Sequence, residues 1–254
     1  MANNSKILLT SVIAILVSAI ILAQGPIPQD PAYHAFADRR TLFGIPNFWN
    51  VISNLPILVC GLIGLVFTAT KKYSGGLPSL QWHYTLFFAG AVLIGMGSSW
   101  YHLYPDNNTL VWDRLPMTLT FMALFSAILG ENISGRAGRV SLWLLPAAGI
   151  ASVYYWHVTE QAGHGDLRFY AIIQFLPLVL IPVIMMLFKS PFRSNRILLW
   201  MLMTYALAKI AEMYDGGIYQ ILNFMGGHAL KHLFAAMGVY CYYLALKHRL
   251  FISG

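Results

Sequence analysis

The chain has few charged residues. Lys, Arg, Asp and Glu make up 10% of its 254 residues, against about 25% in a typical soluble domain. So few charges cannot cover the surface of a water-soluble domain of this size. Hydrophobic residues make up 58% of the chain, which also excludes a disordered polymer. The composition therefore predicts an all-α, polytopic membrane protein.

Cysteine and acidic residues are scarce as well. The two cysteines, Cys60 and Cys241, lie in apolar segments, which excludes a disulfide framework or a cysteine metal site. With nine acidic residues against 16 Lys and Arg, the formal net charge is +7. The basic residues form short clusters between apolar segments rather than one basic face, so we expect no nucleic-acid partner.

Eight apolar segments are long enough to cross a bilayer as helices. They cover residues 7–23, 48–70, 82–104, 110–130, 140–157, 169–188, 196–214 and 227–247. We expect two units: an N-terminal transmembrane helix or uncleaved signal anchor in residues 1–24, and a seven-helix domain in residues 25–254. The sequence does not indicate the oligomeric state.

The charges are distributed unequally between the two ends of these segments. The N-terminus, the C-terminus and the even-numbered connections carry ten Lys and Arg, whereas the other side carries three. This bias predicts that both termini are cytoplasmic. Eight of the nine acidic residues and six of the eight histidines lie toward the outer ends. We therefore expect a protein of a bacterial inner membrane with its site toward the periplasmic side.

Five residues with catalytic chemistry are predicted at one depth near the outer end. Ser98 and His102 are four residues apart and share a helix face. A short turn then returns the chain, so that Asp113 reaches the depth of His102. The last segment opens with His228 and His232, again four residues apart. Ionisable groups are costly in a membrane and usually functional there.

Three imidazoles at one depth suit a zinc ion and leave a fourth position for water. Zinc lowers the pKa of such a water to about 7. We predict His102, His228 and His232 as metal ligands. Asp113 would orient the water or take its proton, and Ser98 would donate to the oxyanion of a tetrahedral intermediate.

The same residues carry a resemblance to a known family. Ser-x-x-x-His, an Asp eleven residues later within Asp-x-Leu-Pro-Met, and a terminal His-x-x-x-His resemble the alkaline ceramidases. They also resemble the wider superfamily that joins those enzymes to the adiponectin and progestin receptors. The run Phe-Trp-Asn-Val-Ile-Ser-Asn at residues 48–54 matches the ceramidase branch. The resemblance covers about residues 38–247 and leaves the first helix as an addition to a seven-helix core.

The resemblance implies a zinc-dependent amidase within the membrane, which cleaves the amide of a ceramide or related N-acyl lipid taken from the bilayer. It assigns zinc to the three histidines, the water to Asp113 and the oxyanion to Ser98. The eukaryotic enzymes bind calcium through an acid-rich segment and a Glu just before Phe-Trp-Asn. Here Asn47 precedes Phe48 and only Asp38 lies shortly upstream, which leaves too few hard oxygen ligands to predict a calcium site.

Other polar residues near the outer end are candidates for support of the site. Asn50 and Asn54 would hydrogen-bond within the bundle. Lys209 and Glu212 are three residues apart and can form an ion pair, and Asp215 follows them. We predict that five residues support the site from around it: Asn50, Asn54, Lys209, Glu212 and Asp215. Lys231 lies between the two histidines of the last segment and is predicted to snorkel away from them to the surface.

Two other functions remain open. A receptor-like member of the superfamily would keep zinc for structure, so that removing the metal lowers thermal stability while lipid amides are not cleaved. A transporter of a small molecule or of protons would use Lys209 and Glu212. Its flux would survive the loss of His228.

Overall fold

The computed structural model describes residues 2–70 and 75–252, and it is all-helical. The helices are two short 3-10 turns, η1 (Pro31–His34) and η2 (Pro78–Leu80), and the α-helices α1 (Asn3–Ala23), α2 (Phe48–Ile52), α3 (Leu55–Ala69), α4 (Gln81–Leu103), α5 (Asn107–Asn132), α6 (Gly135–Gln161), α7 (Arg168–Leu187), α8 (Arg196–Met213), α9 (Asp215–Leu222) and α10 (Gly227–His248). Every one of the eight predicted segments corresponds to a long helix or to the α2–α3 pair. The all-helical prediction is therefore confirmed.

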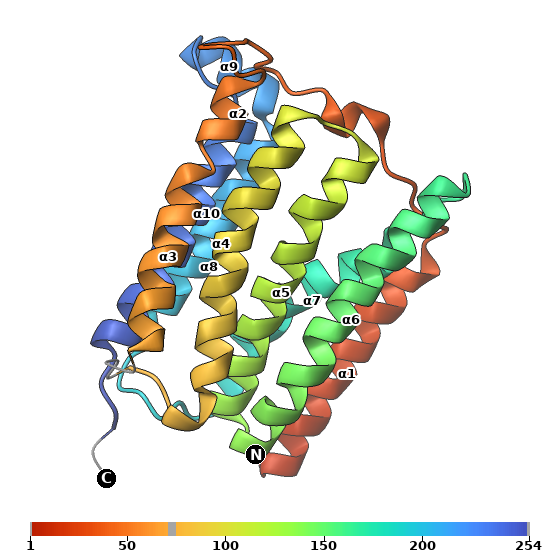
Figure 1. Cartoon of the computed structure of the whole chain (residues 1–254). Helices are drawn as coiled ribbons and strands as arrows, with labels where there is room; N and C mark the ends of the chain where they lie inside the picture. The colour runs from red at the N-terminus through yellow and green to blue at the C-terminus, as the bar shows by residue number, and fades with distance from the viewer. Residues whose placement is uncertain (1, 71–74, 253–254) are drawn as a thin grey trace.

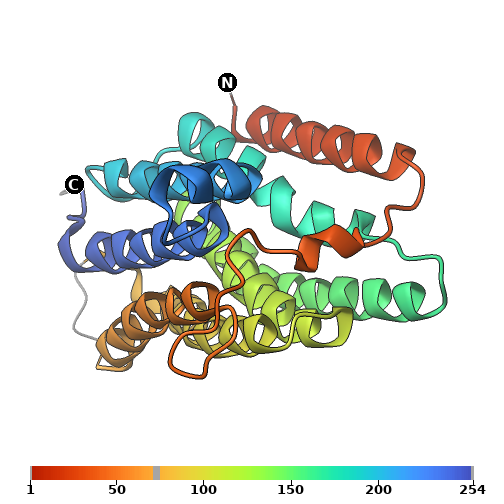
Figure 2. The same cartoon turned by 90° about the horizontal axis from the view of Figure 1, so that it is seen from above.

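The long helices run side by side as one bundle, with α4 and α5 near its middle (Figure 1). α4 packs against α3 and α5, α5 packs against α6, and α8 packs against α10. α1 packs against α7 at the edge of the bundle (Figure 2). We call the end where α4 ends and α10 begins the site end. α1 begins and α10 ends at the opposite end (Figure 1).

Five helical stretches are long and apolar enough to cross a membrane, and α8 with α9 makes a sixth if that pair, bent by 83°, is one span. The sequence predicted eight spans. Among the described helices, α5 and α6 fail this test on composition, since each is longer than 20 residues. Most of α5 is buried, so its side chains meet other helices rather than lipid. A helix in that position need not be apolar all round.

Local sequence features fix how the helices begin and meet at the site end. Asp106 and Thr109 form a capping box that starts α5, which satisfies amide groups that the first helical turn would otherwise leave unpaired. A side chain at Gly97 would collide with the backbone of Trp112, so α4 and α5 approach closely here. This contact sets Ser98 beside the turn of α5 that carries Asp113.

The opposite end is held by a buried ion pair. The Arg249 guanidinium bonds the Glu131 carboxylate at 2.8 Å and the Gly75 carbonyl at 2.7 Å. Both charged side chains are 1% exposed. The Tyr84 hydroxyl donates to the same carboxylate at 2.9 Å. These bonds join the end of α5, the connection before α4 and the chain just after α10.

Candidate active site

Three histidines from two helices converge at the site end. His102 lies in the last turn of α4, and His228 and His232 lie in the first two turns of α10. One potential ligand atom from each side chain lies within 4.8 Å of the other two, and Nε2 of His102 is 3.3 Å from Nε2 of His232. All three residues are at least nine-tenths buried. The structure thus brings together the histidines that the sequence singled out.

The donor set suits a metal ion. Three neutral imidazoles are typical zinc ligands. Nε2 of His228 is buried and has no hydrogen-bond partner within residues 2–70 and 75–252. A buried nitrogen without a partner is costly, and a metal ion at the centre of the group would remove that cost.

Ser53 orients one of the imidazoles. Its Oγ is 2.8 Å from Nδ1 of His232 and 3.3 Å from the carbonyl oxygen of Asn50. A hydroxyl has one proton, and donating it to Asn50 leaves the oxygen free to accept from Nδ1–H. This tautomer leaves Nε2 of His232 unprotonated and directed toward His102, as metal ligation requires.

The connection between α1 and α2 covers the three histidines. The Phe36 ring centroid lies 4.8 Å from that of His102 and 4.6 Å from that of His228, and Phe36 is itself buried. The Asp215 carboxylate accepts from the amide groups of Ala37 and His228, both at 2.8 Å. Asp215 therefore ties the covering segment to the start of α10.

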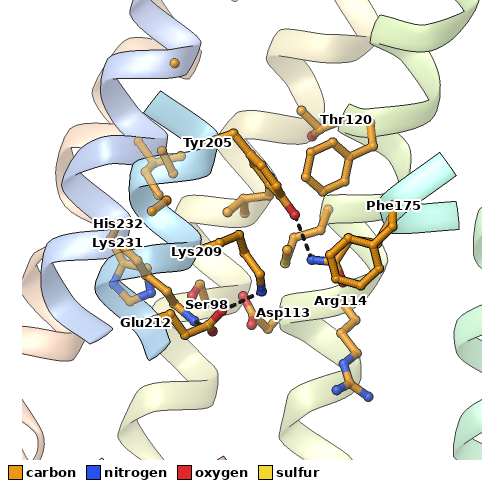
Figure 3. Close-up of a pocket in the computed structure, with 18 of the residues that line it drawn as sticks. Ser98, Asp113, Arg114, Thr120, Phe175, Tyr205, Lys209, Glu212, Lys231 and His232 are labelled. Atoms are coloured by element: carbon orange, nitrogen blue, oxygen red, sulfur yellow. Dashed lines mark hydrogen bonds and ion pairs between the residues drawn. The ribbon is translucent and has the colours of Figure 1, made fainter. Parts of the chain in front are cut away.

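Ser98, Asp113 and His232 line one cavity of about 430 Å³. This volume lies within the range of small-molecule sites, roughly 300–1,000 Å³. The Ser98 hydroxyl interacts with the Asp113 carboxyl group, and Figure 3 shows both near the same end as His232. The rest of the wall is largely apolar and includes Phe87, Phe121, Met201 and Val239. The cavity therefore has one polar end and a long apolar part.

Lys209, Glu212 and Lys231 form a charged cluster on the cavity wall. The predicted pair of Lys209 and Glu212 is present, at 2.5 Å. The prediction for Lys231 is wrong: its ammonium group bonds Glu212 at 2.6 Å, and its side chain is 15% exposed. The reason is the neighbouring carboxylate on α8, which stabilises the ammonium group inside the bundle. Figure 3 shows the cluster beside Ser98 and Asp113.

Arg114 follows Asp113 and also lines the cavity, with its guanidinium directed away from Lys209 and Lys231 (Figure 3). Its guanidinium donates to Oε1 of Gln29 at 2.5 Å. It lies 4.1 Å from the ring centroid of Trp156 and 4.8 Å from that of Tyr170. Such cation–π contacts partly replace the hydration of a buried cation.

The two asparagines near the histidines bond to backbone. Asn50 donates to the carbonyl of Asp38 at 2.9 Å, and Asn54 donates to the carbonyl of Asn50 at 2.8 Å. The Asp38 carboxylate is paired with Arg40 at 2.9 Å. Burial opposes ionisation of Asp38, but the hydrogen bonds from Arg40 outweigh it and lower the pKa of the carboxyl group. The acid upstream of Phe48 is thus already engaged by a cation.

Comparison with known protein families agrees with this arrangement. The family model described as ceramidase matches residues 43–251, well over half of the chain.

The chain belongs to the ceramidase family.

The family implies a hydrolase that acts on amides. The matched region contains all three histidines together with Ser98 and Asp113, whereas α1 lies before it. No curated protein matches the chain.

Four residues of this ceramidase-family site were missed by sequence reasoning: Ser53, Phe36, Arg114 and Tyr33, which lines the cavity and donates its hydroxyl proton to Glu212 at 3.3 Å. Ser53 belongs to the Phe48–Asn54 run that matches the ceramidase branch, so the motif could have indicated that Ser53 lies near the site. Tyr33 and Phe36 lie in a connection without periodicity. Arg114 follows Asp113 directly, and adjacent residues of a helix point in different directions. The sequence therefore did not indicate that both side chains line the same cavity.

Proposed function

We propose that this protein is a zinc-dependent amidase that cleaves the N-acyl bond of ceramide or a related N-acyl lipid, releasing a fatty acid and an amine. One observation carries the proposal: three buried histidines converge, and one of them, His232, lines a largely apolar cavity together with Asp113 and Ser98. A buried apolar cavity selects for an acyl chain, and the polar end is where an amide would lie.

His102, His228 and His232 would hold the metal. Zinc bound there supplies Lewis acidity that activates water at neutral pH. The Asp113 carboxylate accepts the proton that the attacking water loses, and then gives it to the nitrogen that departs as the carbon–nitrogen bond breaks. The Ser98 hydroxyl donates a hydrogen bond to the carbonyl oxygen as negative charge develops on it.

The apolar part of the cavity would hold the acyl chain. Phe87 lies eleven residues before Ser98 on α4, which is about 16 Å along the helix axis. Val239 lies seven residues beyond His232 on α10, about 10 Å deeper. An extended acyl chain with its carbonyl at Ser98 would run along these walls toward the middle of the bundle.

The orientation proposed from the charges fits this arrangement. The start of α1 and the end of α10 lie at the end opposite the histidines (Figure 1). We infer that this end is cytoplasmic and that the site faces the other side of a bacterial inner membrane.

The test is hydrolysis of N-palmitoyl sphingosine by protein purified in detergent, with the released palmitate measured. Asp113→Asn should lower kcat by about 10²–10⁴-fold, the usual contribution of a general base. Asp106→Asn is the matched control: it is the same substitution near the start of the same helix, at an exposed position, and Asn is also a good N-cap.

Two results would contradict the proposal. One is an Asp113→Asn variant that cleaves at the wild-type rate. The other is a wild-type protein that binds zinc and leaves a panel of N-acyl lipids intact, which would favour the receptor-like alternative.

A further inference from the structure

The polar end of the cavity carries more positive than negative side chains. Its wall contains Lys209, Lys231 and Arg114 as cations, against Asp113 and Glu212 as anions. With neutral imidazoles one cation is in excess, and a divalent metal would add to that excess. Unpaired charge beside an apolar wall is unfavourable. A ligand that brings a negative charge would offset it.

Lys209 and Lys231 share one carboxylate, and Lys209 is the more exposed of the two. Glu212 accepts from both lysines, at 2.5 Å from Lys209 and 2.6 Å from Lys231. The Lys231 side chain is 15% exposed, whereas that of Lys209 is 39% exposed. Lys209 is therefore the lysine that can turn toward a ligand while Lys231 keeps Glu212 paired.

Arg114 adds a second cation that is not neutralised by direct contact. Its Nη1 has no hydrogen-bond partner among the described residues, although the residue is only 6% exposed. Its guanidinium contacts Gln29 and aromatic rings, and these contacts leave its charge uncancelled. The cavity thus carries positive side chains from α8 and α10 and, separately, from α5.

Lys209 also lies at the depth of the reacting residues. Ser98, Asp113, His232 and Lys209 are each four to six residues from the site end of their helices. If the amide of a substrate lies at Ser98 and Asp113, the group attached to the amide nitrogen lies at the same depth in the bundle and can reach a side chain on the cavity wall there. The Lys209 ammonium group lies on such a wall (Figure 3).

We propose that Lys209 binds the acidic group of an anionic N-acyl lipid, such as the carboxylate of an N-acyl amino acid. This inference rests on the proposed amidase function and narrows its substrate class. It makes Lys209 a specificity-determining residue, because a cation at this position favours an acidic head group over a neutral one of the same size.

The experiment compares two amides with one acyl chain. N-palmitoyl glycine carries a carboxylate, and N-palmitoyl ethanolamine carries a hydroxyl group in its place. The wild type should cleave the glycine conjugate with a kcat/KM about tenfold higher, the order expected for one charge-assisted contact. Lys209→Gln should abolish that ratio, and Lys209→Arg should retain most of it. Lys189→Gln, an exposed lysine in the connection before α8, is the control and should keep the wild-type ratio.

Binding separates this inference from the amidase function. Both amides are also tested as competitors of a fluorescent fatty acid analogue, which needs no hydrolysis. Tighter binding of the glycine conjugate that depends on Lys209 would support the inference even if neither compound is cleaved. Equal binding and equal cleavage of both amides would overturn it. Competition by free palmitate that depends on Lys209, without preference between the two amides, would overturn it too, because the lysine would then serve the product.

Discussion

Replacing Ser53 by Ala should weaken metal binding without unfolding the bundle. The hydroxyl group accepts from Nδ1 of His232 over 2.8 Å and thereby selects the tautomer with a free Nε2. The variant loses that selection, and the imidazole can protonate Nε2 or rotate. Residues that orient a metal ligand typically contribute a factor of about 10–100 to metal affinity.

The expected size of the effect follows from this contact. A factor of about 10–100 in the dissociation constant corresponds to about 1.4–2.8 kcal/mol. A neutral hydrogen bond by itself contributes only about 0.5–1.5 kcal/mol, so the larger value requires that tautomer control is lost as well. Ser53 is 3% exposed, which limits replacement of the hydroxyl group by solvent.

The assay is competition for zinc between the detergent-purified protein and a chromophoric chelator. Ser53→Ala should raise the dissociation constant, whereas Ser53→Thr, which keeps a hydroxyl group, should stay near wild type. Ser126→Ala is the matched control, because Ser126 is also buried but bonds the backbone of α5 at 2.7 Å. Unchanged zinc affinity in a folded Ser53→Ala variant would refute the reasoning.

Two further predictions concern stability. Arg249→Met leaves Glu131 as an unpaired buried carboxylate, so the free energy of unfolding should fall by about 3–5 kcal/mol; a melting temperature equal to wild type would contradict this. Hydrogen bonds from Arg168 lower the pKa of Asp166 to about 2, below its ordinary value of about 3.9. The stabilisation of the folded state by the Asp166–Arg168 ion pair is therefore present above about pH 4 and lost as the pH falls toward 2. In thermal unfolding, the melting temperature of the wild type should exceed that of Asp166→Asn at pH 6, and the difference should disappear as the pH falls toward 2. A difference in melting temperature that does not change with pH would contradict a stabilising ion pair.

The helices could be predicted from the sequence because the physics of a membrane is restrictive. Lipid forces apolar segments into helices, and the eight segments correspond to the long helices to within a few residues in most cases. Counting residues from the helix ends was enough to predict that Ser98, His102 and Asp113 share a depth with the histidines of α10. The separation of α2 from α3 and the short helix α9 were not predicted, although polar residues and Pro56 stand at the first break and Asp215-Gly216-Gly217 at the second.

The surroundings of the histidines could not be predicted in the same way. Lys231 was expected at the surface because a lysine near a helix end usually snorkels, but Glu212 on another helix holds it inside. Phe36 and Asp215 act through contacts between segments far apart in the chain. Such contacts depend on which helices become neighbours, and spacing along one helix carries no information about that.

The most direct test of the central claim is zinc content by elemental mass spectrometry. Wild-type protein purified in detergent without chelator is measured beside His228→Ala/His232→Ala. The three-histidine site predicts about one zinc ion per wild-type chain and its loss from the double variant. Well-folded wild-type protein without zinc, or a double variant that retains it, would contradict the account.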